Sequence, residues 1–327
     1  MQTVAVARIA MATRFEIVLI GDDPVRLRAA GEEALQEIER LDAQLSFYRP
    51  DSEITHINQR AAAGPVRVEP RLFHLLLKAK CWSHETGGAF DISVAPLLRA
   101  WGFVGGTGSL PDPAVLAEAR ACTGMHLVDL DEDNFTVRFH REGVLLDLGS
   151  LGKGWALEQA VEILREAGID RALLHGGTST VCAIGAPPGA EHWSIAIDDP
   201  ARQSEPGAWS VGSDRRRQPW VTVDLKDEAL SVSGIRGKAF EVDGRILGHV
   251  LDPKTGEPAQ GALLSAVVLP SAAETDVFST ALLVGGLERC DALTALRPGM
   301  RSLVVGVPQN GLPGGVVSNG IALSGRA

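Results

Sequence analysis

From Val144 to Ala156 the chain reads VLLDLGSLGKGWA. An apolar, strand-like run stops at a Gly-rich turn, and apolar residues from Leu157 to Leu164 then recur at helical spacing until Gly168. We therefore predict a strand, a glycine turn and a helix. Glycine lets the backbone approach a ligand closely, and the first N–H groups of a helix attract anions. With the positive charge of Lys153, this stretch is a candidate diphosphate site.

The stretch does not match either of the common nucleotide-binding patterns. A Walker loop needs a glycine five residues before Gly152 and a Ser or Thr after the lysine, but Asp147 and Gly154 occupy these positions. The dinucleotide fingerprint also fails. Taken alone, the three glycines at 149, 152 and 154 are more often a tight turn than a nucleotide site.

Composition and charge restrict the classes of function. The chain has 327 residues, of which 45% are hydrophobic and 22% charged, as in soluble globular proteins, and it can bury a substantial core. Its net charge of −10 argues against sequence-independent binding to nucleic acid or to anionic membranes, both of which rely on excess Lys and Arg. The basic run Arg215-Arg216-Arg217 lies in a polar segment that we predict to be a solvated loop.

The spacing of the cysteines bears on zinc and disulfide sites, and the N-terminal sequence bears on the cellular compartment. The four cysteines, at 81, 122, 182 and 290, are far apart and include no Cys-x-x-Cys pair, so we predict small core residues and neither a zinc site nor a disulfide framework. The first ten residues lack an export signal and no window could span a bilayer, so we expect a cytoplasmic protein by default.

Hydrophobic periodicity predicts a mixed α+β fold in which strands and hairpins alternate with helices. We expect a single domain over residues 1–327, with an extended loop between strands at 199–219. We expect a first helix that begins after Asp22 or Asp23 and ends near Ser46. Four further helices are expected at about 70–85, 113–120, 273–284 and 288–296. Asp243-Gly244 is a hairpin turn signal.

Two histidines end strand-like runs. His249 precedes Asp252-Pro253-Lys254-Thr255-Gly256, and with Asp252 it could act as a general base, because imidazole titrates near neutrality. The alternative is a core histidine bonded to a backbone carbonyl. His175 has the same ambiguity, and we interpret it as structural.

Asp276 and Thr280 are four residues apart and so share one face of the expected late helix, among apolar residues. Burying a carboxylate and a hydroxyl is costly without a partner, and hard oxygen donors suit Mg²⁺. In the alternative reading, Asp276 caps the helix and Thr280 bonds back to the preceding turn.

Several separated motifs occur in the order seen in the ApbE family of FAD:protein FMN transferases, and the resemblance extends from about 11 to 290. The motifs are Met11-Ala12-Thr13, Leu45-Ser46-Phe47-Tyr48 with Pro50-Asp51-Ser52, Gly88-Ala89-Phe90-Asp91, Leu97 with Trp101-Gly102-Phe103, Asp147 to Gly154, Ser233-Gly234, His249 to Gly256, and Asp276 with Thr280.

The resemblance implies a single ApbE-like domain, related to the T-fold, that transfers FMN from FAD to a Ser or Thr hydroxyl of an acceptor flavoprotein. The reaction would need Mg²⁺, with Mn²⁺ as the alternative, would form a phosphoester and would release AMP. Two other functions stay open. One is a Mg²⁺-dependent FAD pyrophosphatase that yields FMN and AMP, and the other is a flavin-binding protein without turnover.

The resemblance also implies site residues. His249, Asp276 and Lys153 would be catalytic, with His249 as the base for the acceptor hydroxyl and Lys153 facing the diphosphate. The metal would be held by the Ser150 carbonyl and the side chains of Asp276 and Thr280. The implied FAD-binding residues are Met11, Ser46, Tyr48, Ala89, Phe90, Asp91, Asp147, Gly152, Lys153, His249 and Leu251.

This chain departs from the family pattern at several positions. Ala12 replaces the usual glycine, a change expected to narrow the pocket mouth, and Thr178 stands where many relatives have Asp or Asn. The residues after Ser233-Gly234, from 235 to 239, lack the usual aromatic, and Leu247 replaces a tyrosine. We expect these departures to affect acceptor choice and activity more than the binding of FAD and metal.

Overall fold

The computed structural model describes residues 1–198, 200, 220–235, 237–243, 245–308 and 314–323. Apart from Pro200, the loop expected over 199–219, with its arginine run, lies outside the described residues, as do Arg236 and Gly244.

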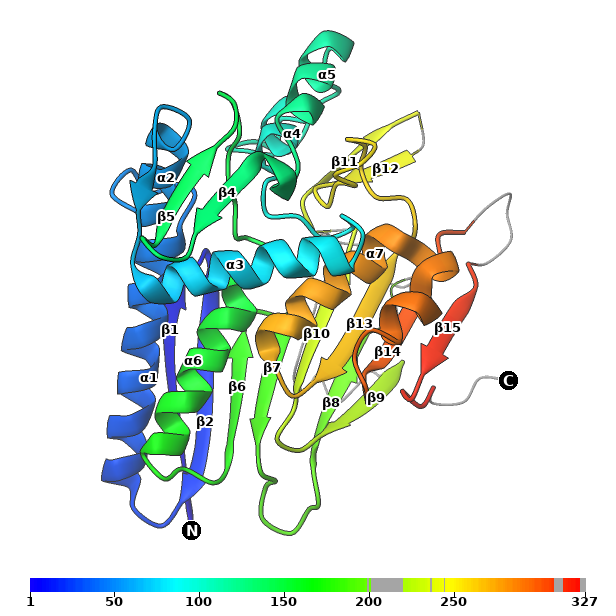
Figure 1. Ribbon diagram of the computed structural model, residues 1–327. Helices are drawn as coiled ribbons and strands as arrows, with labels where there is room; N and C mark the ends of the chain where they lie inside the picture. The colour runs from blue at the N-terminus through cyan, green and yellow to red at the C-terminus, as the bar shows by residue number, and fades with distance from the viewer. Residues whose placement is uncertain (199, 201–219, 236, 244, 309–313, 324–327) are drawn as a thin grey trace.

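A large antiparallel sheet organises the molecule, in the order β1-β2-β6-β7-β10-β13-β14-β15 (Figure 1). Strands from both ends of the sequence therefore lie in one sheet. The strands are β1 (Gln2–Ala10), β2 (Thr13–Gly21), β6 (Ala172–Gly176), β7 (Thr180–Ile184), β10 (Ala229–Gly234), β13 (Leu264–Leu269), β14 (Arg301–Val305) and β15 (Val316–Asn319).

Helices cover one face of this sheet. Figure 1 shows α6 between α1 and α7 on that face, with α3 crossing near their ends, and the main hydrophobic core lies between helices and sheet. The helices are α1 (Pro24–Leu45), α2 (Glu53–Arg60), α3 (Pro70–Glu85), α4 (Ala95–Ala100), α5 (Pro113–Ala121), α6 (Gly152–Glu166) and α7 (Ala272–Thr294), with a 3₁₀ turn at Met125–Leu127.

A second core lies on the opposite face, where the hairpin of β8 (Trp193–Ile197) and β9 (Val221–Leu225) packs. Two small sheets complete the described part. They are β3 (Val66–Arg67) with β5 (Thr136–Phe139) and β4 (Val128–Asp131), and the hairpin of β11 (Ala239–Val242) with β12 (Arg245–Gly248). The pairing of Val242 with Arg245 confirms the predicted hairpin. The mixed α/β fold is as predicted.

The helix signals located most boundaries correctly. Asp23 caps α1 by accepting hydrogen bonds from the N–H groups of Val25 and Arg26, and the helix ends before Ser46. The two late helices join into α7, which bends at Gly286, where φ is 64° and ψ is −162°. A residue with this backbone conformation is almost always glycine.

The predicted strand before the glycine turn is wrong. Residues 144–148 have no regular secondary structure and belong to no sheet. The Asn58 side chain replaces a neighbouring strand, because its Oδ1 accepts from the Leu146 N–H at 2.7 Å and its Nδ2 donates to the Leu146 carbonyl at 2.9 Å. The Asp147 N–H donates to the Ile92 carbonyl at 2.7 Å. The Leu146 N–H and carbonyl and the Asp147 N–H are thus hydrogen-bonded without a neighbouring strand.

The cysteine prediction fails at one position. Cys122, Cys182 and Cys290 are buried free thiols, but Cys81 is exposed. The inward face of α3 is formed by residues such as Leu76, Ala79 and Trp82, and Cys81 lies on the other side of that helix.

Within the described ranges, no helix is both long and apolar enough to cross a membrane.

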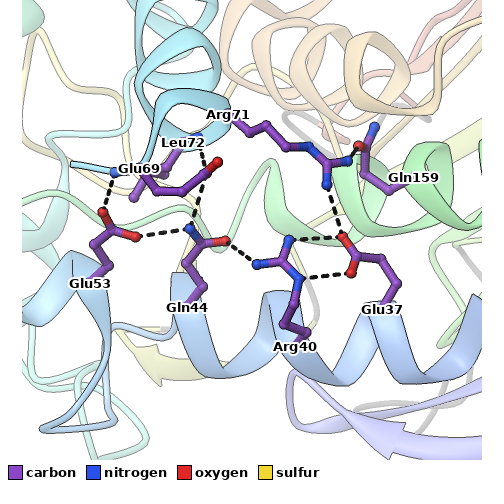
Figure 2. A network of polar contacts seen from close by, with 8 residues as sticks. All are labelled: Glu37, Arg40, Gln44, Glu53, Glu69, Arg71, Leu72 and Gln159. Carbon is purple, nitrogen blue, oxygen red and sulfur yellow. Dashed lines mark hydrogen bonds and ion pairs between the residues drawn. The ribbon is translucent and has the colours of Figure 1, made fainter. Parts of the chain in front are cut away.

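A polar network joins α1, α2, α3 and α6 (Figure 2). Glu69 caps α3 through the Leu72 N–H at 2.9 Å, and its own N–H donates to Glu53 on α2 at 2.6 Å. Arg71 reaches both Glu37 on α1 and Gln159 on α6. The hydrogen bond from Arg40 lowers the pKa of Glu37. Through Gln159 the network also contacts α6, whose first turn carries Lys153.

Candidate active site

A cavity of about 580 Å³ opens where several turns meet the first turns of α6 and α7. Its size lies within the roughly 300–1,000 Å³ typical of small-molecule sites. The walls come from the β1–β2 turn, the segments on either side of α4, the turn before α6, the β6–β7 turn, the end of β10, the chain after β12, and α7.

Most of the residues implied by the motifs line this cavity. They are Met11, Tyr48, Ala89, Asp91, Asp147, Ser150, Lys153, His249, Leu251, Asp276 and Thr280. Ser46, Phe90 and Gly152 are not among the lining residues. His175 lies within β6 opposite Glu16 and does not line it either. Burial lowers the pKa of His175.

The Asp276 carboxylate is held from two sides. Its Oδ1 accepts hydrogen bonds from the Thr180 hydroxyl at 2.8 Å and the Ser231 hydroxyl at 2.5 Å. Its Oδ2 accepts from the Gly154 N–H at 2.7 Å. The side chain is 6% exposed and faces the cavity. The alternative reading, in which Asp276 caps its helix, is wrong, because Ser271 caps α7 through the Glu274 N–H.

Gly154 allows the start of α6 to touch α7. A Cβ at this position would lie 2.2 Å from the Ala272 carbonyl oxygen and 3.0 Å from Asp276 Cγ, so no side chain fits there. Two of the first N–H groups of α6 bond within the protein and are not free for an anion, contrary to the expectation of an open helix N-terminus. The Gly152 N–H donates to the Leu148 carbonyl at 2.6 Å, and the Gly154 N–H is used by Asp276.

The oxygen donors at this end of the cavity fit a hard divalent cation. Among the residues that the structure describes, no group of three His, Cys, Asp or Glu side chains could hold a metal. Ser150, Asp276 and Thr280, however, line the same cavity and offer carbonyl, carboxylate and hydroxyl oxygens. Mg²⁺ is commonly held by one or two carboxylates together with water and substrate phosphates. The hydrogen bonds to the buried Asp276 carboxylate come from neutral groups, namely one backbone N–H and two hydroxyls. Because these donors carry no formal charge, a cation at Asp276 would offset its negative charge.

Two lysines add positive charge to the cavity wall. Lys153 and Lys238 both line the cavity, and their charges partly offset the effect of burial, which raises the pKa of Asp147. Burial, together with the Asp147 charge, raises the pKa of Tyr48. Tyr48 is 63% exposed, so it lies at the mouth of the cavity.

His249 lines the cavity, and one of its ring nitrogens contacts a backbone carbonyl. It directly follows β12, and its Nδ1 lies 3.2 Å from the Lys238 carbonyl oxygen. A carbonyl only accepts hydrogen bonds, so Nδ1 carries the proton and Nε2 is the basic nitrogen. Burial lowers the pKa of His249, as do the charges of Lys153 and Lys238, while the bond to the carbonyl acts in the opposite direction. Burial therefore favours the neutral form of the imidazole.

Some implied ligand residues instead support the wall. The Ser46 hydroxyl accepts from the N–H groups of Tyr48 and Arg49, both at 3.2 Å, which shapes the turn that carries Tyr48. The Asp91 carboxylate accepts from Ser83, Ser93 and the Met125 N–H. Its lone pairs are therefore engaged by the protein itself.

Met11 and Ala12 form the two-residue turn between β1 and β2, since Ala10 pairs with Thr13. Their φ angles are 48° and 57°, in the left-handed region that favours glycine. The positive φ angles at both central residues match a type I′ hairpin turn. Ala12 lines the cavity with Met11, so the departure from the family glycine lies at the site itself.

Sequence reasoning missed several wall residues. Phe103 and Lys238 line the cavity, and the Phe103 ring lies 6.4 Å from the His249 ring. Phe103 lies in the motif Trp101-Gly102-Phe103 and Lys238 lies within 235–239, but the resemblance implies no role for either side chain. Thr180 and Ser231 carry no sequence signal, because isolated hydroxyl residues are ordinary in strands.

Comparison with known proteins places this architecture in a family. The ApbE family model matches residues 11–304. FAD:protein FMN transferases of Klebsiella pneumoniae and Treponema pallidum are each 28% identical, over 284 and 293 residues, which is 85% of this chain and 77% of each relative. The crystal structure of the ApbE protein from Thermotoga maritima has a TM-score of 0.82 at 28% identity, covering 98% of this chain and 97% of that one. The apo flavinyl transferase ApbE of Pseudomonas stutzeri has a TM-score of 0.81 at 28% identity and covers 98% and 95%. The chain therefore belongs to the ApbE family.

Proposed function

We propose that this protein is a Mg²⁺-dependent FAD:protein FMN transferase that forms a phosphoester on a Ser or Thr hydroxyl of an acceptor flavoprotein and releases AMP. The activity in its coarse form, flavin transfer from FAD to protein, rests on the family and its curated relatives. The observation that carries the finer proposal is the convergence of Lys153, His249 and Asp276 on one cavity from distant parts of the chain.

In the proposed reaction the acceptor hydroxyl oxygen bonds to the phosphorus of the FMN half of FAD. The bond from that phosphorus to the bridging oxygen breaks, and AMP leaves with the electron pair. The hydroxyl proton passes to Nε2 of His249, whose neutral form and bonded Nδ1 suit this role. Lys153 offsets the negative charge that develops on the diphosphate.

Ser150, Asp276 and Thr280 would hold the Mg²⁺ ion, or Mn²⁺ in its place. When bound, the metal neutralises phosphate charge. The protein fixes the carboxylate through hydrogen bonds from Thr180, Ser231 and Gly154.

The remaining wall would receive the rest of FAD. Met11, Ala89 and Leu251 would provide apolar surface, and Asp147 would add a polar position. Asp91, whose carboxylate is engaged by Ser83, Ser93 and the Met125 N–H, would act by holding the shape of the wall. Tyr48 would cover the mouth. Ser46, Phe90 and Gly152 would act indirectly by shaping the wall.

The test is to incubate the purified protein with FAD, Mg²⁺ and a panel of flavin-accepting protein domains, and to measure both in-gel flavin fluorescence and AMP. The expected result is covalent flavin on an acceptor with AMP in equal amount, and loss of both with EDTA. Equal AMP release with and without acceptor would indicate a pyrophosphatase, and intact FAD after hours would indicate binding without turnover. Acceptor variants that lack the Ser or Thr serve as controls.

A further inference from the structure

Asp276 has two buried neighbours that cannot touch a ligand. Thr180 is 0% exposed and Ser231 is 1% exposed, and neither lines the cavity. Both hydroxyls point at Asp276 Oδ1, at 2.8 and 2.5 Å. Their hydroxyls therefore reach the cavity only indirectly, through the Asp276 carboxylate that they contact.

The two hydroxyls come from the middle of the sheet. Thr180 begins β7 and Ser231 lies on β10, and these residues are paired in the antiparallel register. Strands β7 and β10 are neighbours beneath α7, the helix that carries Asp276 (Figure 1). Rigid strands thus present both donors to one oxygen. A further hydroxyl, that of Thr275, lies 2.9 Å from the Ser231 oxygen and completes the chain of contacts.

Counting acceptor positions identifies the oxygen that remains available. A carboxylate has about four lone-pair sites, two on each oxygen. On Oδ1 the two sites are used by Thr180 and Ser231, whereas Oδ2 accepts one bond, from the Gly154 N–H. The remaining site is on Oδ2, and Asp276 lines the cavity.

We propose that Thr180 and Ser231 are positioning residues that anchor Oδ1 of Asp276 and so leave Oδ2 to bind the divalent cation. The inference rests on the proposed function only in taking Asp276 as a metal ligand. Groups that orient a metal ligand typically affect metal affinity by about 10- to 100-fold. The geometry therefore assigns a role in metal affinity to two residues outside the cavity.

The decisive experiment measures Mn²⁺ binding to the full-length protein without FAD, by the loss of the free-ion signal in electron paramagnetic resonance. Thr180→Val removes the hydroxyl with little change in shape, and we expect it to weaken Mn²⁺ binding at least about tenfold. Ser231→Ala should act in the same direction. Thr180→Ser restores a donor and should bind Mn²⁺ within about threefold of the wild type.

A matched control separates positioning from general damage to the core. Ser302 is also 0% exposed, and its hydroxyl lies 2.8 Å from that of Thr294, at the far end of α7. Ser302→Ala should leave the Mn²⁺ affinity unchanged, and thermal unfolding reports whether each variant is folded. In turnover, Thr180→Val should raise the Mg²⁺ concentration for half-maximal rate more than it lowers the rate at saturating Mg²⁺.

A folded Thr180→Val variant that binds Mn²⁺ as tightly as the wild type would overturn the inference. Equal weakening in Thr180→Val and Thr180→Ser would also do so, because the hydroxyl would then not be the cause. Failure of the wild type to bind Mn²⁺ would overturn both the metal assignment and this inference. A wild type that binds Mn²⁺ with the expected variant pattern but transfers no flavin would contradict only the proposed function.

Discussion

The Gly154 N–H, in the first turn of α6, donates a 2.7 Å hydrogen bond to Asp276 Oδ2 in α7, across a separation of 122 residues. This bond joins the glycine-rich turn to the candidate metal ligand. It explains why the turn has glycine after Lys153, since a Cβ would collide with the Ala272 carbonyl at 2.2 Å. The turn is therefore a helix-docking element as well as one wall of the cavity.

Gly154→Ala should destabilise the protein by about 1–3 kcal/mol, because the added methyl group forces α6 away from α7. Urea unfolding would measure the free energy of unfolding. Gly64→Ala is the matched control, since a Cβ there meets nothing within 4 Å, and it should change stability by less than about 0.5 kcal/mol. Equal stability of the two variants would show that the helices accommodate the methyl group.

His249→Ala should lower the rate of flavin transfer by about 10²-fold or more and leave FAD affinity nearly unchanged, because a general base acts in the chemical step. Transfer kinetics and FAD titration measure the two quantities separately. His140→Ala, at an exposed histidine paired with Asp129, is the control. An equal loss of transfer and of FAD affinity would make His249 a pocket residue instead.

The pH dependence of transfer should report the lowered pKa of His249. Burial disfavours the imidazolium, so the neutral base persists below the ordinary histidine value of 6.5. The acidic limb of the rate profile should therefore be centred below pH 6.5, as Nε2 becomes protonated there. Measuring kcat/KM from pH 5 to 8 with saturating metal tests this expectation. An acidic limb centred above pH 6.5 that persists in His249→Gln would assign the titration to another group.

Ala12→Gly should stabilise the protein by roughly 0.5–1 kcal/mol. The native φ of 57° costs alanine about 1–2 kcal/mol, and the greater freedom of glycine in the unfolded chain offsets part of the gain. Chemical denaturation measures the difference. Ala5→Gly, within β1, should instead cost about 0.5–1 kcal/mol. A loss of stability in Ala12→Gly would mean that the alanine methyl makes compensating contacts.

Local signals predicted the helices well. Asp23 before Pro24 and the apolar stripe of α1 define a helix whatever lies beside it. The same kind of reasoning failed at 144–148, where the apolar pattern is real but Asn58 takes the place of a partner strand. The prediction that every cysteine is a core residue failed at Cys81, because a small apolar side chain is not by itself evidence that its side of the helix packs against the core.

The sequence by itself determined most of the helices and the motifs. Through the resemblance of those motifs to the ApbE family, it also determined the candidate site residues. Ser150, Lys153, His249 and Asp276 all line the cavity, but their roles there stay predictions. Only the tertiary structure decided that Gly154, Thr180 and Ser231 together hold one carboxylate. The physical reason is that such hydrogen bonds depend on strand register and helix docking, which bring together groups that no local pattern of residues connects.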